Sequence, residues 1–566
     1  NAGKGDGTTR SAYNNVGVGK EALVSITSGY QIVAIGQEAG YNVTTASRSV
    51  MIGHQAGKGI TTSTEYGTYV GMTAGGTNTQ GNHNTFIGGN AGGASKAATT
   101  ETTGIGRSAL AGVSGASNTA VGYSAASATN AAVEITAVGH ATLRTVTGSY
   151  NTAIGKGVMG DGAGSGAYNT GVGTRALQAI TNGNSNTAVG KSALQTINTQ
   201  GENTAVGMQS GYSVSTSYNT LMGSRAGEKL SGGSGYNTVV GAWAARGDSD
   251  LFSGSYNTVM GSHALGDTSL KDTSRNVYIG FKAGYEALSV TDNVVIGYHA
   301  AYTDETGNSN VYIGYESGYT ANGADKNIGV GKQSLKAVTT GTGNIGIGYR
   351  AGYKVTTTAN NIAIGNQAME DATGAGNVIA IGEYSGYNPI GANNIFMGYQ
   401  SGYGTAGGTL TANSNVGIGK SALKFISTAQ LNVAVGHLAG HYLTTSSENV
   451  AVGANALRGH DTQATASDAN TALGNSAMYY ASGSNNNVAI GDSALMGAST
   501  GMQGDSNVAI GRQAMANATD PYDTVAIGNY AGYDVTTGYQ NTLVGYYAGG
   551  NITTGYLNTA LGNSAL

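Results

Sequence analysis

Apolar and polar positions recur along this chain with a period close to 17 residues. A glycine that in most repeats follows Val or Ile marks the repeat, first at Gly19, Gly36 and Gly53 and last at Gly562, and 32 such anchor glycines follow one another at spacings of 16 to 21 residues. The consensus reads Asn, Thr or Val, a small or apolar residue, Val or Ile, Gly, two variable residues, Ala or Ser, and then Leu or Gly. A repeat this regular indicates stacked structural units rather than ordinary domains.

Each repeat predicts one short β-strand followed by a return turn. The β-branched run before the glycine favours a strand, and the glycine marks a bend or a close backbone approach. The remaining residues, such as QTINTQGE from Gln195, are rich in Ser, Thr, Asn and Gly, which is typical of turns. The period is too short for helix-pair repeats of about 33 residues or propeller blades of about 40. We therefore predict an all-β fold, a parallel β-solenoid (β-roll) of about 32 coils with little or no helix, running through residues 1–566 as one continuous repeat array.

The strand pattern is apolar or small on both faces, which is typical of strands that are buried on both sides. We expect one face to form a ladder inside the coil, made by Val121, Val189, Ile490 and Ile510. The other face carries the small residues Ala120, Ala188, Ala489 and Ala509. This face needs a second surface to cover it. Because no other element of the chain can supply that surface, we predict a homo-oligomer around a common axis. The sequence alone does not choose between two and three chains.

The Asn that opens each strand is expected to be structural, because stacked Asn side chains hydrogen-bond to neighbouring coils and favour turns. The Asn, the last strand residue and the glycine of three clear copies serve as the structural repeat anchors: Asn118, Val121, Gly122, Asn186, Val189, Gly190, Asn487, Ile490 and Gly491.

Composition removes several classes of protein. The chain has 96 glycines without a three-residue period, which excludes collagen, and only 10% charged residues with a net charge of −4. No run of Lys and Arg could follow a phosphate backbone, so nucleic acid is not an expected partner. No apolar stretch approaches the roughly 20 residues that span a bilayer, so we expect no membrane insertion. The absence of cysteine excludes disulfides and thiolate metal sites.

The strings NVAIGDSA from Asn487 and NVAIGRQA from Asn507 resemble the Asn-Ser-Val-Ala-Ile-Gly-x-x-Ser repeat in the heads of YadA-like trimeric autotransporter adhesins. Similar repeats occur in tail-fibre proteins of tailed bacteriophages. The resemblance covers all 32 repeats and implies three β-rolls side by side around a threefold axis, with a role in reaching and holding a surface. It implies nothing about which target is held.

Two departures favour the phage fibre over the adhesin. The adhesin head repeat is shorter than this one, and we find neither a heptad stalk nor membrane-anchor strands. The chain also ends at Leu566 inside a regular repeat without a capping coil, so we expect a segment of a longer fibre.

Motifs for catalysis or cofactor binding are absent. Strings such as GIGKSA from Gly417 match G-x-G-x-x-A, but here the motif is the repeat itself and no acidic partner follows at the required place. We expect no cofactor, no metal site and no enzyme. Carboxylates from separate coils could still form a glycan-cleaving site, and interrupted Thr pairs such as Thr44 and Thr356 leave an ice-binding solenoid as a further alternative.

The long coils after Gly241, Gly261, Gly398, Gly453 and Gly491 are the places where loops leave the solenoid. Function on solenoids tends to lie on such insertions. Candidate surface contacts in these coils are Trp243, Arg246, Asp248, Tyr403 and His460. The only tryptophan could stack on a sugar or pack on its own loop, and Arg246-Gly247-Asp248 is a short match to an integrin-type motif.

These observations predict the structural shaft of a virion tail fibre, an extracellular homotrimer that spaces and presents contacts to the host. Its expected partners are adjoining fibre or baseplate proteins and a host surface glycan or protein. The alternative is the head of a cell-surface trimeric adhesin on a bacterium.

Overall fold

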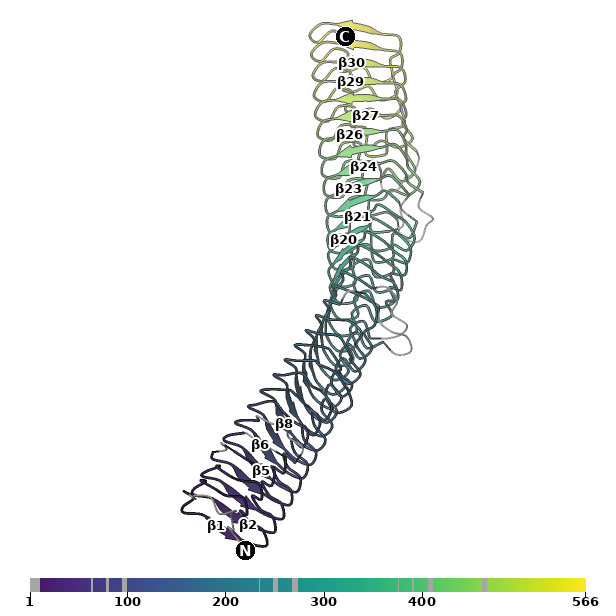
Figure 1. Cartoon of the computed structure of the whole chain (residues 1–566). Helices are drawn as coiled ribbons and strands as arrows, with labels where there is room; N and C mark the ends of the chain where they lie inside the picture. The colour runs from purple at the N-terminus through teal and green to yellow at the C-terminus, as the bar shows by residue number, and fades with distance from the viewer. Residues whose placement is uncertain are drawn as a thin grey trace. The chain divides into compact units, whose positions relative to one another are not determined.

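The computed structural model describes residues 11–62, 65–77, 81–93, 99–233, 235–247, 253–266, 273–374, 376–388, 391–405, 411–460 and 466–566. The chain divides into two compact units, Asn1–Lys282 and Ala283–Leu566, here called unit 1 and unit 2. Within each unit the coils are stacked one on the next in chain order (Figure 1). That the repeats form one continuous array through residues 1–566 stays a prediction.

Each coil contributes one strand of three residues. The strands of unit 1 are β1 (Val16–Val18), β2 (Val33–Ile35), β3 (Val50–Ile52), β4 (Thr68–Val70), β5 (Thr85–Ile87), β6 (Thr103–Ile105), β7 (Thr119–Val121), β8 (Thr136–Val138), β9 (Thr152–Ile154), β10 (Thr170–Val172), β11 (Thr187–Val189), β12 (Thr204–Val206), β13 (Thr220–Met222), β14 (Thr238–Val240), β15 (Thr258–Met260) and β16 (Val277–Ile279). The strands of unit 2 are β17 (Val294–Ile296), β18 (Val311–Ile313), β19 (Ile328–Val330), β20 (Ile345–Ile347), β21 (Ile362–Ile364), β22 (Ile379–Ile381), β23 (Ile395–Met397), β24 (Val416–Ile418), β25 (Val433–Val435), β26 (Val450–Val452), β27 (Thr471–Leu473), β28 (Val488–Ile490), β29 (Val508–Ile510), β30 (Val525–Ile527), β31 (Thr542–Val544) and β32 (Thr559–Leu561).

Consecutive strands within each unit pair in parallel and in register. In unit 1, β10 pairs with β11 through Thr170 opposite Thr187, and in unit 2, β24 pairs with β25 through Val416 opposite Val433. Equivalent residues of adjacent coils thus stack directly on one another, most often 17 positions apart in the sequence. The described residues contain no helix. The predicted parallel β-solenoid of about 32 coils is confirmed.

The two faces of the strand are the reverse of the prediction. The middle residue lies inside the coil and is fully buried, as for Ala120, Ala188, Ala489 and Ala509. The third residue faces outward, so that Val121 is 36% exposed and Val189, Ile490 and Ile510 are partly exposed. The physical reason is the width of the coil. Leu194 and Ile197 of the turn are also fully buried, which leaves room for only a small residue at the middle of the strand.

Residue volumes inside the coil compensate for one another. Where the middle strand residue is large, the turn residue four places after the anchor is glycine: a Cβ on Gly92 would lie 2.7 Å from the Phe86 ring, and one on Gly402 would lie 2.3 Å from the Phe396 ring. Where the middle residue is Gly171, that turn position is Leu177. In these coils the exchange keeps the interior close-packed.

The anchor glycines are fixed by backbone geometry. Gly190 has a φ of +132°, and a Cβ placed on it would lie 2.4 Å from the carbonyl oxygen of Gly207 in the next coil. Gly122 and Gly491 show the same left-handed φ and the same close approach, to Gly139 and Gly511. The predicted close backbone approach at these positions is confirmed.

The Asn residues form a buried ladder along the inside of the turn. Asn186 accepts a hydrogen bond at Oδ1 from the backbone N–H of Asn203 (3.1 Å) and donates through Nδ2 to the carbonyl of Gln200 (2.9 Å). Its own backbone N–H donates to Oδ1 of Asn169 (2.9 Å). Asn118 and Asn487 make equivalent bonds and are likewise fully buried. The structural role predicted for the Asn column is confirmed.

Candidate functional site

The outward side of the strands is here called the outer sheet face and is formed by the first and third residue of every strand. Since the middle residue points inward, these two residues point outward from each coil. The third residue is Val, Ile, Met or Leu in all 32 strands, and neither position carries a charge in any strand. The register of the pairing stacks these side chains into two straight columns.

The outer sheet face exposes a substantial part of its apolar side chains. Several third-position residues in both units are between 38% and 40% exposed: Ile35, Ile87, Ile154, Ile347, Ile418 and Ile527. Sixteen coils at about 4.8 Å per strand give a stripe on the order of 75 Å long in each unit. Soluble monomers rarely expose a contiguous apolar patch beyond a few hundred Å².

Trp243 lies in a stack of aromatic and cationic side chains. The Arg225 guanidinium of the preceding coil lies 4.6 Å from the Trp243 ring centroid, and the His263 ring of the following coil is parallel to it at 6.0 Å. Arg246 lies 4.1 Å from the same ring. Burial, and then the positive charges of Lys282 and Arg246, lower the pKa of His263. Trp243 therefore has side chains of its own unit on both ring faces.

Arg246 also forms an ion pair. Its Nε lies 3.1 Å from Oε2 of Glu228, and the two side chains are only 25% and 11% exposed. Gly247 is buried, and Asp248 lies outside the described residues. The guanidinium needed for an integrin-type contact is thus already engaged within the chain.

Tyr403 and His460 belong to separate coils of unit 2, with two coils between them. Tyr403 stacks on Tyr387 with ring centroids 5.0 Å apart and an interplanar angle of 4°. Burial raises the pKa of Tyr403, and nearby tyrosines and carboxylates add to the effect. His460 Nε2 lies 3.0 Å from the carbonyl oxygen of Ser499, and its ring lies 6.2 Å from that of Tyr480. The sequence-predicted contacts therefore do not form one site.

Aromatic ladders are a feature that the sequence analysis missed. Tyr218, Tyr236 and Tyr256 precede three successive strands, and their rings stack at 4.7 and 5.2 Å with interplanar angles of 0° and 2°. Each of these rings is about half exposed, at 45%, 47% and 55%. The signal was present in the sequence, because tyrosine recurs one residue before the opening Asn in consecutive repeats.

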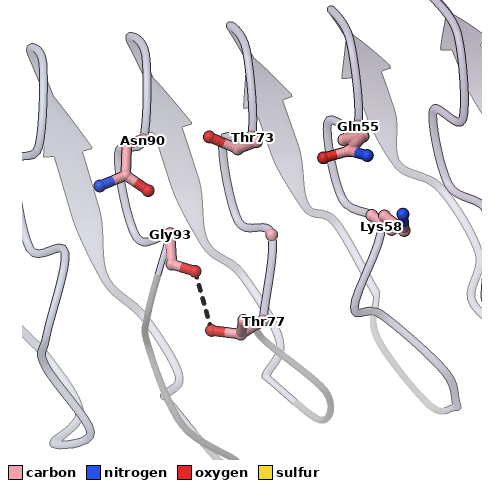
Figure 2. Close-up of a pocket in the computed structure, with 7 residues that line it drawn as sticks. Gln55, Lys58, Thr73, Thr77, Asn90 and Gly93 are labelled. Carbon is pink, nitrogen blue, oxygen red and sulfur yellow. Dashed lines mark hydrogen bonds between the residues drawn. The ribbon is translucent and has the colours of Figure 1, made fainter.

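A shallow polar hollow of about 220 Å³ lies on the turns of unit 1 (Figure 2). Gln55, Lys58, Thr73, Gly76, Thr77, Asn90 and Gly93 line it. The hollow exists because Gly76 and Gly93 stand where the preceding coil has Lys58. Lys58 is paired with Oε2 of Glu38 at 2.5 Å, a contact that lowers the pKa of Glu38. Because Lys58, the cation in its lining, is paired with Glu38, this hollow offers a ligand hydrogen bonds but no unpaired charge.

Among the described residues, no group of three or more His, Asp or Glu side chains is placed to hold a metal ion. An apolar helix of membrane-spanning length is likewise not found in the part of the chain that the structure describes. Searches against protein-family models and against curated proteins find no match to this chain.

Proposed function

We propose that this chain is the structural shaft of a virion tail fibre, an extracellular homotrimer that spaces and presents contacts to a host surface. The observation that carries the proposal is the outer sheet face, which carries no charge in either unit and has an aliphatic third residue in every strand. Several of its third-position side chains are more than one-third exposed in a single chain, as for Ile347 and Ile418 at 38% each. Covering such a stripe is favourable by roughly 25 cal/mol per Å² of apolar surface.

A second copy of the same chain is the occupant that fits this face best. Only another solenoid with the same coil height repeats its side chains at the same interval along the whole stripe. Copies related by rotation about an axis parallel to the solenoid present identical faces to one another and close into a ring without an open end. The number three comes from the resemblance to adhesin heads and phage tail fibres.

The mechanism of a shaft is mechanical. Parallel backbone pairing, the buried Asn ladder and the close glycine stack tie each coil to its neighbours. Burial of the outer sheet face between copies would add an apolar core along the common axis, so that bending or local opening would have to expose it. Such a rod transmits position and force and needs no catalytic group.

Sedimentation equilibrium tests the proposal. A mass near three times 56.4 kDa is expected. The double substitution Ile347→Lys with Ile418→Lys should dissociate the assembly, because the interface would then bury unpaired charges. Thr199→Lys places a charge on an exposed turn residue and should leave the mass unchanged.

A monomeric wild-type chain would contradict the proposal and would favour a single-chain solenoid with an ice- or glycan-binding face. An outer-membrane anchor in the full-length gene would favour the adhesin head over the fibre.

A further inference from the structure

A second hollow, of about 420 Å³, lies on the turns of unit 2. Thr405, Phe425, Tyr442 and Thr444 line it, and they come from three successive coils. Unlike the polar hollow of unit 1, this one has two aromatic rings as its main wall. The two threonine hydroxyls provide hydrogen-bonding groups beside the rings.

The two rings form a stacked aromatic pair. Phe425 and Tyr442 are stacked at 5.2 Å with an interplanar angle of 8°. Each lies six residues after its anchor glycine, and the same position is Gly404 in the preceding coil and Gly459 in the following coil. The backbone N–H of Gly404 donates to the carbonyl of Lys424 (2.9 Å), which holds the glycine in register with Phe425. The ring face of Phe425 that points toward Gly404 therefore has no side chain stacked on it from that position.

Two cations flank the aromatic pair. The Lys424 ammonium lies 5.0 Å from the Phe425 ring centroid. The Arg458 guanidinium lies 5.1 Å from the Tyr442 ring and 5.0 Å from that of Tyr479. Within the described part of the chain, neither cation forms an ion pair, in contrast to Lys58, Lys336, Arg246 and Arg350.

His441 completes the surroundings without adding charge at neutral pH. It is buried, its Nδ1 lies 3.0 Å from the carbonyl oxygen of Ser421, and its ring meets Phe425 edge to face. Burial lowers the pKa of His441 to about 4, and the neighbouring charges of Arg458 and Lys424 act in the same direction. The net charge beside the hollow therefore comes from Lys424 and Arg458.

We propose that this hollow binds an acidic sugar residue of a surface polysaccharide. The apolar C–H face of a pyranose stacks on an aromatic ring, and Phe425 has a glycine, Gly404, where the preceding coil could have supplied a stacked side chain. The sugar carboxylate would pair with Lys424 or Arg458, which have no acidic partner among the described residues. The sugar hydroxyls would bond to Thr405 and Thr444. The inference rests on the proposed function in that it names the class of host-surface contact that the fibre would make.

An acidic glycan fits this site better than a nucleic acid. Affinity for nucleic acid comes mainly from several phosphate contacts at once, whereas this site offers two cations on a chain of net charge −4. A single carboxylated sugar needs only one stacking face and one or two cations, which matches the size of the hollow. Single-stranded DNA therefore serves as the competing ligand in the test.

The test uses the full chain and measures binding of fluorescein-labelled polygalacturonate oligomers by anisotropy at low salt. Binding is expected for polygalacturonate and not for neutral dextran of the same length. Phe425→Ala and Arg458→Gln should each weaken binding about tenfold, the effect of losing one stacking contact or one charged hydrogen bond. Tyr539→Ala is the matched control, because Tyr539 also forms a stacked pair, with Tyr556 at 4.9 Å, but is not among the residues that line this hollow. Its affinity should equal that of the wild type.

The proposal is overturned if polygalacturonate binds no better than dextran, or if Phe425→Ala and Arg458→Gln bind as the wild type does. Tighter binding of a single-stranded DNA homopolymer would assign the site to nucleic acid instead. Far-UV circular dichroism and sedimentation of each variant check that the solenoid is intact. A trimer that binds no acidic glycan would refute only this inference, whereas a monomer that binds it through Arg458 would refute only the fibre assembly.

Discussion

Units 1 and 2 have the same interior and different exteriors. Both stack three-residue strands with a buried middle residue, an anchor glycine and a buried Asn ladder. On the outer sheet face, however, the first strand residue is threonine in every strand from β4 to β15 of unit 1, whereas it is valine or isoleucine in every strand from β17 to β26 of unit 2. The third residue is aliphatic in both units.

The difference shows that inward positions determine how the coil folds, whereas outward positions determine what the coil can contact. Inward positions must stay buried and fit between the coils on either side, even where their volumes differ, as at Ala188 and Phe86. Outward positions meet only solvent or a partner, and threonine has nearly the shape of valine, so the exchange leaves the coil unchanged. What changes is the apolar fraction of the outer sheet face, which we expect to make association through unit 2 stronger than through unit 1.

The strongest test of the shared interior is substitution of an anchor glycine in each unit. Gly190→Val and Gly419→Val both place a side chain at a φ near +130° and less than 3 Å from the carbonyl oxygen of the next glycine. Backbone strain and overpacking together should lower the free energy of unfolding by more than about 4 kcal/mol in either unit. Hydrogen exchange of the neighbouring coils is the measurement. A large effect in one unit and none in the other would show that the interiors are not equivalent.

The repeat made most of the interior predictable from sequence. The period of the anchor glycines located every strand, and the glycine and Asn columns have the roles that their residue types implied, as Gly190 and Asn186 show. The direction of the faces was not predictable from the strand alone, because alanine and valine are both acceptable inside a core. The space left by Leu194 and Ile197 of the turn decides it.

The sequence did contain a signal for the direction of the faces. Phe86 is followed by Gly92, and Gly171 by Leu177, so in these repeats a large residue at one of the two positions goes with glycine at the other. Such compensation indicates that the two side chains share one cavity. The hollow at Phe425 could not be predicted from the sequence, because it depends on which turn residue lies next to that ring in the adjacent coil.

Asp304 gives unit 2 a titrating group in its interior. The carboxyl is fully buried where most coils have an apolar residue, Oδ1 accepts a bond from the N–H of Gly307 (2.8 Å), and Oδ2 has no hydrogen-bond partner. Burial raises the pKa of Asp304 to about 7, with a smaller contribution from the charge of Asp325. Among the described residues of unit 1, the most buried carboxylate that forms an ion pair is that of Glu228, with Arg246.

The pH dependence of unit 2 follows from that shift. The folded-state pKa of Asp304 lies above its unfolded value, so the folded state holds the proton of this carboxyl more tightly. The contribution of Asp304 to the stability of unit 2 is therefore greatest below about pH 4 and declines as pH rises to about 7. The loss should be on the order of 2–4 kcal/mol. Hydrogen exchange of β17 and β18 across this range measures it. Asp304→Asn keeps the bond from Gly307 and should abolish the slope, and an unchanged slope in this variant would assign the effect to other groups.

The smallest expected effect is the most direct test of the difference between the exteriors. Ile362→Thr makes one outer position of unit 2 resemble unit 1, and Thr187→Val does the reverse in unit 1. Both residues are partly exposed at the first position of their strands, so neither change alters the packing inside the coil. Ile362→Thr should weaken self-association and Thr187→Val should strengthen it, each by about 1 kcal/mol per substituted side chain, measured from the concentration dependence of sedimentation.

Thr199→Val adds the same apolar group on an exposed turn and should not change self-association. If Thr199→Val and Thr187→Val had equal effects, association would depend on general surface hydrophobicity, and the contrast between the two outer faces would have no role in assembly.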